Sequence, residues 1–481
     1  MSTSALRALS GQDRHVARRF SGGLTPELAR DVDRAGSGRA WFAEQLRPGR
    51  IGDRAGDAID GWFPSLRRTP EQIFDRQVND VQGAWDVMGD LSRWTVARRI
   101  HSRRQLHEQL VDFWSNLLHV PLMDDSAWFF RVDYDRVIRK HALRSFEDLL
   151  IRTTVHPAMG LFLDNAVSTK EAPNENLGRE LLELHTVGVD GGYTERDVKH
   201  SSRMLTGYRV DLWWPKFRAF YDPKAHHTGR IKVLGFVHPN RDADGRRATR
   251  AYLRHLAQHP ATARRIAHRL CVRFVHDDPS NDLVRTVARA YRRNASAIRP
   301  TLEAMVDHPE FAEASRQKIR TPTEDYVATV RALGIELHRP TSEDSFANAM
   351  LWQYGELGNA PYEWPAPNGY PEAGAAWTSA GRILSGLDLH RTLAAGWWPT
   401  EDARVRSLEE WLPAMPASVG EIIDHVSGLL FGEPPSRGVR AGVATALGLP
   451  LEQVVPASQM WSTRTLSIVA SLLDSPTHLM R

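Results

Sequence analysis

Apolar residues recur along most of the chain at the three- and four-residue spacings of an α-helix. Residues 110–120, LVDFWSNLLHV, are almost wholly apolar and predict a buried core helix. Further helical stripes cover residues 134–165 and 247–333, with proline or glycine at their ends. No period of about 20–50 residues marks a solenoid. The pattern therefore predicts a mainly α protein with a large, bundle-like body of many helices.

The helical period breaks between residues 208 and 237. Residues 208–221 are rich in aromatic side chains, including Trp213 and Trp214, and residues 231–237 are apolar and β-branched. A turn-rich tip lies between these two runs. Aromatic and β-branched runs bounded by turn residues are typical of strands. We therefore expect a small β-hairpin or aromatic insertion at this point.

Proline and glycine residues also indicate how the chain divides. We expect short helices in residues 1–65, a helical core with the insertion in residues 66–393, and a C-terminal helical region in residues 394–481. Within the core, residues 359–375 form a proline- and glycine-rich loop that carries Trp364. Long loops of this kind are usually functional or disordered, and the aromatic residues argue against disorder.

The densest group of polar residues lies in residues 174–207, NENLGRELLELHTVGVDGGYTERDVKHSSRMLTG. Residues 176–185 predict a helix of about three turns. Thr194, with Asp197 three residues later, is a capping signal for a second helix over residues 195–205. The stretch therefore predicts a helix–loop–helix placed just before the insertion.

One face of the first helix carries Asn176, Arg179, Glu180 and Glu183 at about 100° per residue. His185 lies ~140–160° around the helix from both glutamates, so it is not expected to bind a metal beside them. In a functional interpretation, the glutamates hold a divalent cation, or one of them acts as general acid or base. In a structural interpretation, Arg179 neutralises them in ion pairs worth ~0.2–0.5 kcal/mol each. The sequence leaves both interpretations open.

Residues elsewhere in the core extend this candidate site. The catalytic candidates beside Glu180 and Glu183 are His226, or its neighbour His227 on the opposite strand face, and Lys232, which could stabilise negative charge. The substrate-binding candidates are Asp164, Asn165, Asn174, Glu175, Asn176, Arg179 and Trp364.

Composition excludes several classes of protein. The 62 basic and 58 acidic residues give a net charge of +4, and the excess is dispersed, so we expect no nucleic-acid partner. Cys271 is the single cysteine, which excludes an intrachain disulfide and a cysteine-based zinc site. No haem, flavin or nucleotide signature is present, which leaves a divalent cation as the cofactor to consider. Without a signal-peptide core or a run of ~18–20 apolar residues, we expect a cytoplasmic protein with no membrane contact.

An ordered series of motifs resembles a large bacterial family known as domain of unknown function 1800. The series comprises Tyr134-Asp135-Arg136, His156-Pro157-Ala158-Met159, Leu163-Asp164-Asn165, Asn174-Glu175-Asn176, Arg179-Glu180-Leu181, Gly191-Gly192-Tyr193-Thr194, Leu205-Thr206-Gly207, Asp222-Pro223, Thr228-Gly229, His259-Pro260-Ala261-Thr262 and Thr321-Pro322. The resemblance implies a mainly helical fold. It also implies a partner of the domain of unknown function 1501 type, and many family members are exported. Where relatives tend to have phenylalanine-tryptophan-histidine-asparagine-histidine, this chain has Phe113-Trp114-Ser115-Asn116-Leu117, which puts any role of those two histidines in doubt.

Two functions fit these observations. The first is an enzyme that hydrolyses or transfers a group on a polar glycan- or peptide-like substrate, with or without a divalent cation. The second is a non-catalytic accessory protein that docks a partner enzyme through its aromatic loops at 208–221 and 361–377.

Overall fold

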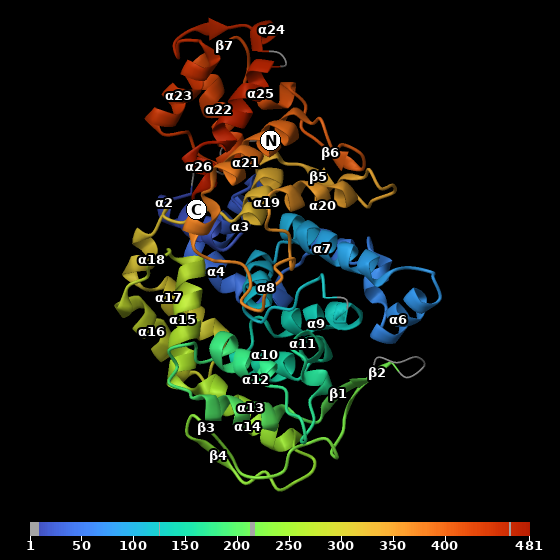
Figure 1. The fold of residues 1–481 in the computed structure, drawn as a ribbon. Coiled ribbons are helices and arrows are strands. Elements are labelled where there is room, and N and C mark those ends of the chain that lie inside the picture. Colours follow the sequence, from blue (N-terminus) through green and yellow to red (C-terminus); the bar gives the residue numbers. More distant parts are fainter. Residues whose placement is uncertain (1–8, 125, 212–216, 461–462) are drawn as a thin grey trace.

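Helices dominate the computed structural model, which describes residues 9–124, 126–211, 217–460 and 463–481 (Figure 1). The described residues form 25 α-helices, and their strands pair only as two-stranded antiparallel sheets. The predicted mainly α class with small β elements is confirmed. Trp213 and Trp214 lie outside the described residues.

The first hydrophobic core gathers buried side chains from Leu9 to Ala314, together with Tyr362. Its helices are α2 (Gly11–Arg19), α3 (Pro26–Ala35), α4 (Gly38–Gln45), α6 (Pro70–Val78), α7 (Ala84–His101), α8 (Gln105–Leu117), α9 (Trp128–His141), α10 (Phe146–Thr154), α11 (Pro157–Phe162), α12 (Asn176–Glu180), α13 (Glu195–Leu205), α14 (Arg246–Gln258), α15 (Pro260–Phe274), α16 (Asn281–Arg293), α17 (Ile298–Val306) and α18 (Pro309–Glu313). α5 (Arg54–Ile59) and the second half of α7 pack instead into the second core. The predicted core helix corresponds to α8, which buries Leu110, Phe113 and Trp114.

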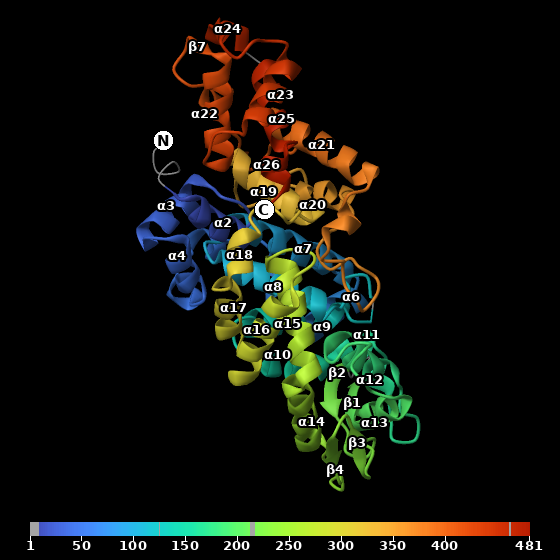
Figure 2. The same ribbon diagram turned by 90° about the vertical axis from the view of Figure 1, so that its left-hand side faces the viewer.

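A second hydrophobic core lies toward the other end of the elongated molecule (Figure 2). Its helices are α19 (Pro322–Leu333), α20 (Phe346–Glu356), α21 (Ala380–Ala395), α22 (Val419–Phe431), α23 (Arg437–Leu447), α24 (Ala457–Met460), α25 (Thr463–Leu473) and α26 (Pro476–Leu479). Short single turns join the helices of both cores: η1 (Pro48–Arg50), η2 (Pro64–Arg67), η3 (Asn165–Val167), η5 (Gly374–Trp377) and η6 (Glu409–Trp411). The predicted domain boundaries at residues 65 and 393 stay a prediction.

Three helices begin with a His-Pro pair in which the histidine is the N-cap. His156, His259 and His308 precede α11, α15 and α18, and proline occupies the first helical position in each. Each imidazole Nδ1 accepts a hydrogen bond of 3.2–3.3 Å from the backbone N–H two residues later. The acceptor role places the ring proton of the neutral form on Nε2 at all three positions.

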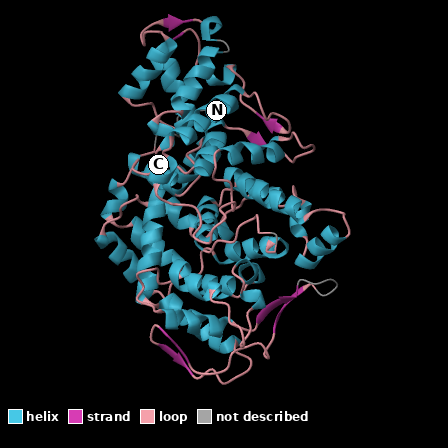
Figure 3. Cartoon of the chain, in the orientation of Figure 1, coloured by secondary structure: helices cyan, strands magenta, loops and turns pink. Residues whose placement is uncertain are grey.

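The strands lie at the edges of the helical body (Figure 3). Residues 208–238 form two hairpins, β1 (Tyr208–Asp211) with β2 (Arg218–Tyr221) and β3 (Ile231–Val233) with β4 (Phe236–His238). Two further pairs, β5 (Glu336–Leu337) with β6 (Ala403–Arg404) and β7 (Ala417–Ser418) with β8 (Val454–Val455), brace the second core.

The last residues return to the middle of the molecule, between the two cores (Figure 1). Met480 bridges Ile319, and the backbone N–H of Arg481 donates to the Lys318 carbonyl at 2.8 Å. The C-terminal end therefore packs against the segment that enters α19.

Candidate functional site

The central helix changes its winding after Glu180. α12 continues as η4 (Leu181–His185), a π-helix whose hydrogen bonds span five residues. The step of about 100° per residue, from which the angle between Glu180 and His185 follows in an α-helix, therefore does not hold across this turn. Single π turns within helices occur frequently at functional sites.

Three carbonyl groups of η4 accept hydrogen bonds from residues outside it. The Thr186 hydroxyl donates to the Leu181 carbonyl at 2.6 Å, and the Gly188 N–H donates to the Leu182 carbonyl at 3.0 Å. Arg265 of α15 donates to the Leu184 carbonyl at 3.1 Å. These bonds stabilise the wide turn without a regular helix end.

The two glutamates of the predicted pair have different surroundings. Glu183 accepts a hydrogen bond of 2.7 Å from the Tyr193 hydroxyl, and its carboxylate lies 3.6 Å from Arg179. The carboxylate of Glu180 has no hydrogen-bond partner among the described residues. Burial and the neighbouring Glu183 raise the pKa of the Glu180 carboxyl, and Arg179 opposes them.

Arg179 pairs chiefly outside its own helix. Its two terminal nitrogens each donate at 2.7 Å to a carboxylate oxygen of Glu195 at the start of α13. Its contacts with Glu175 at 3.5 Å and Glu183 at 3.6 Å are longer. The bidentate pair fastens the two helices of the predicted helix–loop–helix to each other. The structural interpretation of the acidic face therefore accounts for Arg179 but not for Glu180.

Part of the predicted substrate-binding set converges. Asn176 Nδ2 donates to Asp164 Oδ2 at 3.2 Å, and the Asn176 backbone N–H donates to Asn174 Oδ1 at 2.8 Å. Asp164 adopts a left-handed conformation with φ of 58°, which aims the next residue, Asn165, inward. The 164–165 turn and the start of the central helix are thus one polar unit.

A pocket of about 250 Å³ lies between this turn and the β1–β2 hairpin. It is lined by Thr154, Val155, His156, Pro157, Gly160, Asn165, Ala166, Tyr208, Arg209, Val210, Ala219, Phe220 and Tyr221. Asn165 donates to the Leu205 carbonyl, while its buried Oδ1 has no partner among the described groups. An unpartnered buried acceptor beside an aromatic wall fits a ligand that carries a hydrogen-bond donor.

His226 and Lys232 occupy different environments. His226 is buried, with Nδ1 2.9 Å from the Thr206 carbonyl and Nε2 3.2 Å from Asn240 Oδ1. Lys232 is exposed on β3, opposite Val237. His226 therefore fastens the loop that follows β2, and Lys232 points to solvent.

Trp364 lies in the loop that the sequence singled out. Its carbonyl faces His119 Nε2 at 2.6 Å, and its indole donates to Asn368. Tyr362 and Trp377 of the same loop are buried, so much of the loop packs into the body. A polar cavity of about 30 Å³, the size of one water, lies where the loop meets α8 and α19.

His185 is fully buried at the end of the π-helix. No described group lies within hydrogen-bonding distance of either ring nitrogen. Burial first, then Arg265 and His119, lower the pKa of His185 to about 3. A neutral imidazole therefore sits in the first core beside the central helix.

A groove with a volume of about 530 Å³ runs between α15 and α16. Five exposed arginines line it: Arg264, Arg285, Arg289, Arg292 and Arg293. Asp282 pairs with Arg285 at 3.4 Å. These arginines make the groove positively charged, and it faces solvent.

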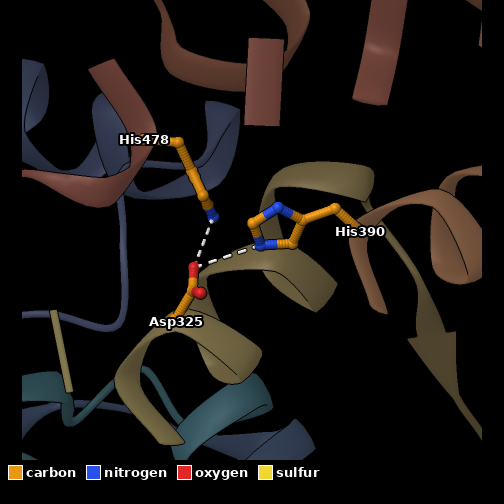
Figure 4. A group of neighbouring side chains, drawn as sticks. All are labelled: Asp325, His390 and His478. Atoms are coloured by element: carbon orange, nitrogen blue, oxygen red, sulfur yellow. Dashed lines mark hydrogen bonds and ion pairs between the residues drawn. The ribbon is translucent and has the colours of Figure 1, made fainter. Parts of the chain in front are cut away.

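A cluster that the sequence analysis missed joins three helices of the second core. Asp325 from α19, His390 from α21 and His478 from α26 are all buried, and both imidazoles approach the same carboxylate oxygen (Figure 4). Nε2 of His390 lies 3.3 Å from Asp325 Oδ1, and Nε2 of His478 lies 3.2 Å from it. The rings stand nearly perpendicular, at 81°.

Two further charged groups complete this cluster. Arg382 donates to Asp325 Oδ2 at 2.6 Å, and Asp474 Oδ1 lies 2.8 Å from His390 Nδ1. Burial opposes a charge on His390, but Asp325 and Asp474 raise its pKa to about 9. Burial lowers the pKa of His478 to about 4. With His390 charged and His478 neutral, two cations balance two carboxylates.

A second buried network lies where the two cores meet. Arg273 of α15 contacts Asp112 at 2.7 Å, Glu324 at 2.9 Å and Glu372 at 3.1 Å. Arg481 reaches the same Glu324 at 2.9 Å. Burial would raise the pKa of Glu324, but Arg273 and Arg481 lower it to about 2.

A sequence signal for the missed cluster existed, although it was weak. His390 occupies a buried position of α21 next to Leu389 and four residues before Ala394. A histidine within an apolar helical stripe needs a polar partner inside the protein. The identity of that partner could not be read from spacing, because Asp325 and His478 lie far away along the chain.

These observations define a large, mainly helical protein whose two hydrophobic cores are fastened together by buried ion pairs. The chain belongs to the family described as Protein of unknown function (DUF1800), whose model matches residues 15–480. The resemblance inferred from the sequence motifs is thereby confirmed. No curated protein and no solved structure matches the chain. None of the described helices has the length and apolar character needed to cross a membrane.

Proposed function

We propose that this chain is an enzyme that hydrolyses or transfers a group on a polar glycan- or peptide-like substrate. The proposal rests on the unequal surroundings of Glu180, which directly precedes the π-helix, and Glu183, which lies within it. Carboxylates with contrasting environments are typical of general acid and base pairs. Glu180, whose pKa is raised, would donate the proton, and Glu183 would act as the base or orient the attacking group.

The polar unit beside the pair supports a substrate with hydroxyl or amide groups. Asp164, Asn174 and Asn176 offer amide and carboxylate groups within one connected set of hydrogen bonds. The aromatic pocket at Asn165 would hold a second part of the substrate. His226, Lys232 and Trp364 remain candidates whose roles are predictions, and their surroundings give them no direct contact with this unit.

The test compares Glu180→Gln and Glu183→Gln with the unaltered chain on panels of glycans and peptides. We expect each substitution to lower the rate at least a hundredfold, because general acid–base catalysis contributes about 10²–10⁴-fold. The matched control is Glu171→Gln, which alters an exposed glutamate shortly before the same helix. Equal activity of all three variants, or no activity of the unaltered chain on either panel, would contradict the proposal.

The alternative function is that of an accessory protein that docks a partner enzyme. In the described chain, Trp352 and Trp397 are 69% and 62% exposed, which is unusual for tryptophan outside an interface. The predicted docking loop at 361–377 is less accessible, because Tyr362 and Trp377 are buried. Co-expression with a protein of the domain of unknown function 1501 type tests this alternative. The alternative would be favoured by a stable complex that Trp352→Ser and Trp397→Ser weaken. Both variants keep the buried Trp377, so the loss would come from the exposed tryptophans.

A further inference from the structure

We propose that Asp325, His390 and His478 bind one divalent cation of the zinc class. The donor atoms are Oδ1 of the carboxylate and Nε2 of both imidazoles. This site is separate from the acidic helix face, and the proposal does not depend on an enzymatic function.

The distances between the donor atoms suit a tetrahedral ion. Bonds of about 2.0–2.2 Å from zinc to histidine and carboxylate place neighbouring donors roughly 3.3–3.5 Å apart. The two distances from Asp325 Oδ1 are 3.3 Å to His390 and 3.2 Å to His478. All three donor atoms lie within 4.8 Å of one another, so a small rotation of one imidazole would bring the two Nε2 atoms to the separation that a shared ion requires.

Neighbouring side chains orient the donor atoms by hydrogen bonds, as the groups that surround metal ligands in proteins do. Asp474 accepts from His390 Nδ1 at 2.8 Å, which directs Nε2 toward Asp325 and makes it a better ligand. Arg382 occupies Asp325 Oδ2 and leaves Oδ1 to face the imidazoles. Figure 4 shows both rings aimed at this one oxygen.

A hydroxyl group lies where it could serve as the fourth ligand of a tetrahedral ion. Thr329 Oγ1, one turn after Asp325 on α19, lies 2.9 Å from His478 Nε2. The three proposed ligands are at most 3% exposed. A closed site of this kind is structural, in contrast to the open position that catalytic zinc sites keep.

A divalent ion that replaces one proton adds one positive charge beside Asp325 and Asp474. Without a cation, His390 carries a proton between Asp325 and Asp474, and the ion takes the place of that proton on Nε2. Each ligand comes from a different helix, so the ion cross-links α19, α21 and α26. We therefore expect the cation to stabilise the attachment of the C-terminal residues to the second core.

The experiment uses the full chain, stripped with a chelator and titrated with Co²⁺ or Zn²⁺ alone. We expect one equivalent to bind, the visible spectrum of tetrahedral Co²⁺, and a melting temperature several degrees above that of the stripped chain. His390→Gln and His478→Gln should each weaken binding at least tenfold, because second-shell changes alone cost about 10–100-fold. The matched control, His276→Gln, alters a histidine outside the cluster, whose Nε2 lies 3.0 Å from Glu310 and whose Nδ1 accepts from the Asp278 backbone N–H, and this variant should bind as the unaltered chain does.

Two results would overturn the proposal. The first is a stripped chain that binds no Co²⁺ and melts at the same temperature with and without Zn²⁺. The second is binding of equal affinity and identical spectrum in the two histidine variants, since the ion would then lie elsewhere. If both variants fail to fold, the titration of the unaltered chain still decides, because absence of a tetrahedral Co²⁺ spectrum rules the site out.

Discussion

The hydroxyl of Tyr193 lies 2.7 Å from Oε1 of Glu183 and joins the loop after the π-helix to the acidic face. This bond fixes the orientation of one glutamate, while Glu180, one turn earlier, has none among the described groups. The pair is therefore asymmetric although the two side chains are chemically identical.

Replacing Tyr193 by phenylalanine tests the importance of that orientation. Tyr193→Phe leaves Arg179, at 3.6 Å, as the nearest partner of Glu183. We expect kcat/KM to fall about tenfold or more, because a hydrogen bond to a charged group is worth roughly 1.5–3 kcal/mol. The melting temperature should change little, since the bond lies near the surface. Undiminished activity on a substrate that Glu183→Gln no longer turns over would contradict this prediction.

The raised pKa of Glu180 predicts a pH-dependent effect on stability. Burial and Glu183 raise the pKa of this carboxyl in the folded state, so the folded chain holds the proton more tightly than the unfolded chain does. Stability therefore falls as pH rises from the unfolded value, about 4.5, through the folded pKa. Glu180→Gln should raise the melting temperature at pH 7 more than at pH 4.

Thermal unfolding at both pH values measures this difference, with Glu171→Gln as the exposed control. Equal effects of Glu180→Gln at pH 4 and pH 7 would show that the carboxyl is not destabilised by its surroundings.

Buried neutral histidines predict a loss of stability as pH falls, which is opposite to the effect of Glu180. Burial is the main cause that lowers the pKa of His15, His101 and His119 to about 4 and that of His185 to about 3. Below about pH 6.5 the unfolded chain binds protons that the folded chain excludes, so stability falls as pH decreases toward 4. Each histidine contributes a slope of about 1.4 kcal/mol per pH unit within that window.

Chemical denaturation between pH 7 and pH 4.5 measures the slope. His185→Leu should reduce the slope by about one proton, because this variant lacks the buried imidazole whose pKa is lowered to about 3. An unchanged slope in His185→Leu would mean that this imidazole accepts a proton inside the folded protein.

The network at the junction of the cores predicts a large cost for removing one partner. Arg273→Met leaves Glu324 and Glu372 buried with fewer cations, which should lower the free energy of unfolding by about 3–5 kcal/mol. The control Arg254→Met breaks a surface pair with Glu147 and should cost at most about 1 kcal/mol. Adding Glu324→Gln to Arg273→Met should recover part of the loss, and purely additive costs would argue against a coupled network.

Sequence patterns predicted those elements that are determined by residues close together along the chain. The capping box of Thr194 and Asp197 begins α13 at Glu195, and the helix ends at Leu205 as expected. The insertion was expected between residues 208 and 237 as one hairpin or aromatic loop. It forms two hairpins, because the pairing of strands depends on which of them meet in space.

The π-helix and the buried clusters were not predictable in the same way. Nothing in the residues 181–185 marks a wide turn, which depends on partners such as Arg265 on a distant helix. Asp325, His390 and His478 likewise become neighbours only when α19, α21 and α26 pack together. Periodicity identifies a buried face, but it cannot say which other buried face will meet it.

In the π-helix at residues 181–185 each backbone hydrogen bond spans five residues, one more than in an α-helix. If the same five residues wound as regular α-helix, everything after them would rotate by about one residue step, ~100°, relative to Glu180. Glu183 would turn away from Tyr193, and His185 would leave the core. The wide winding of this five-residue segment therefore sets the orientation of the acidic face relative to the loop that follows.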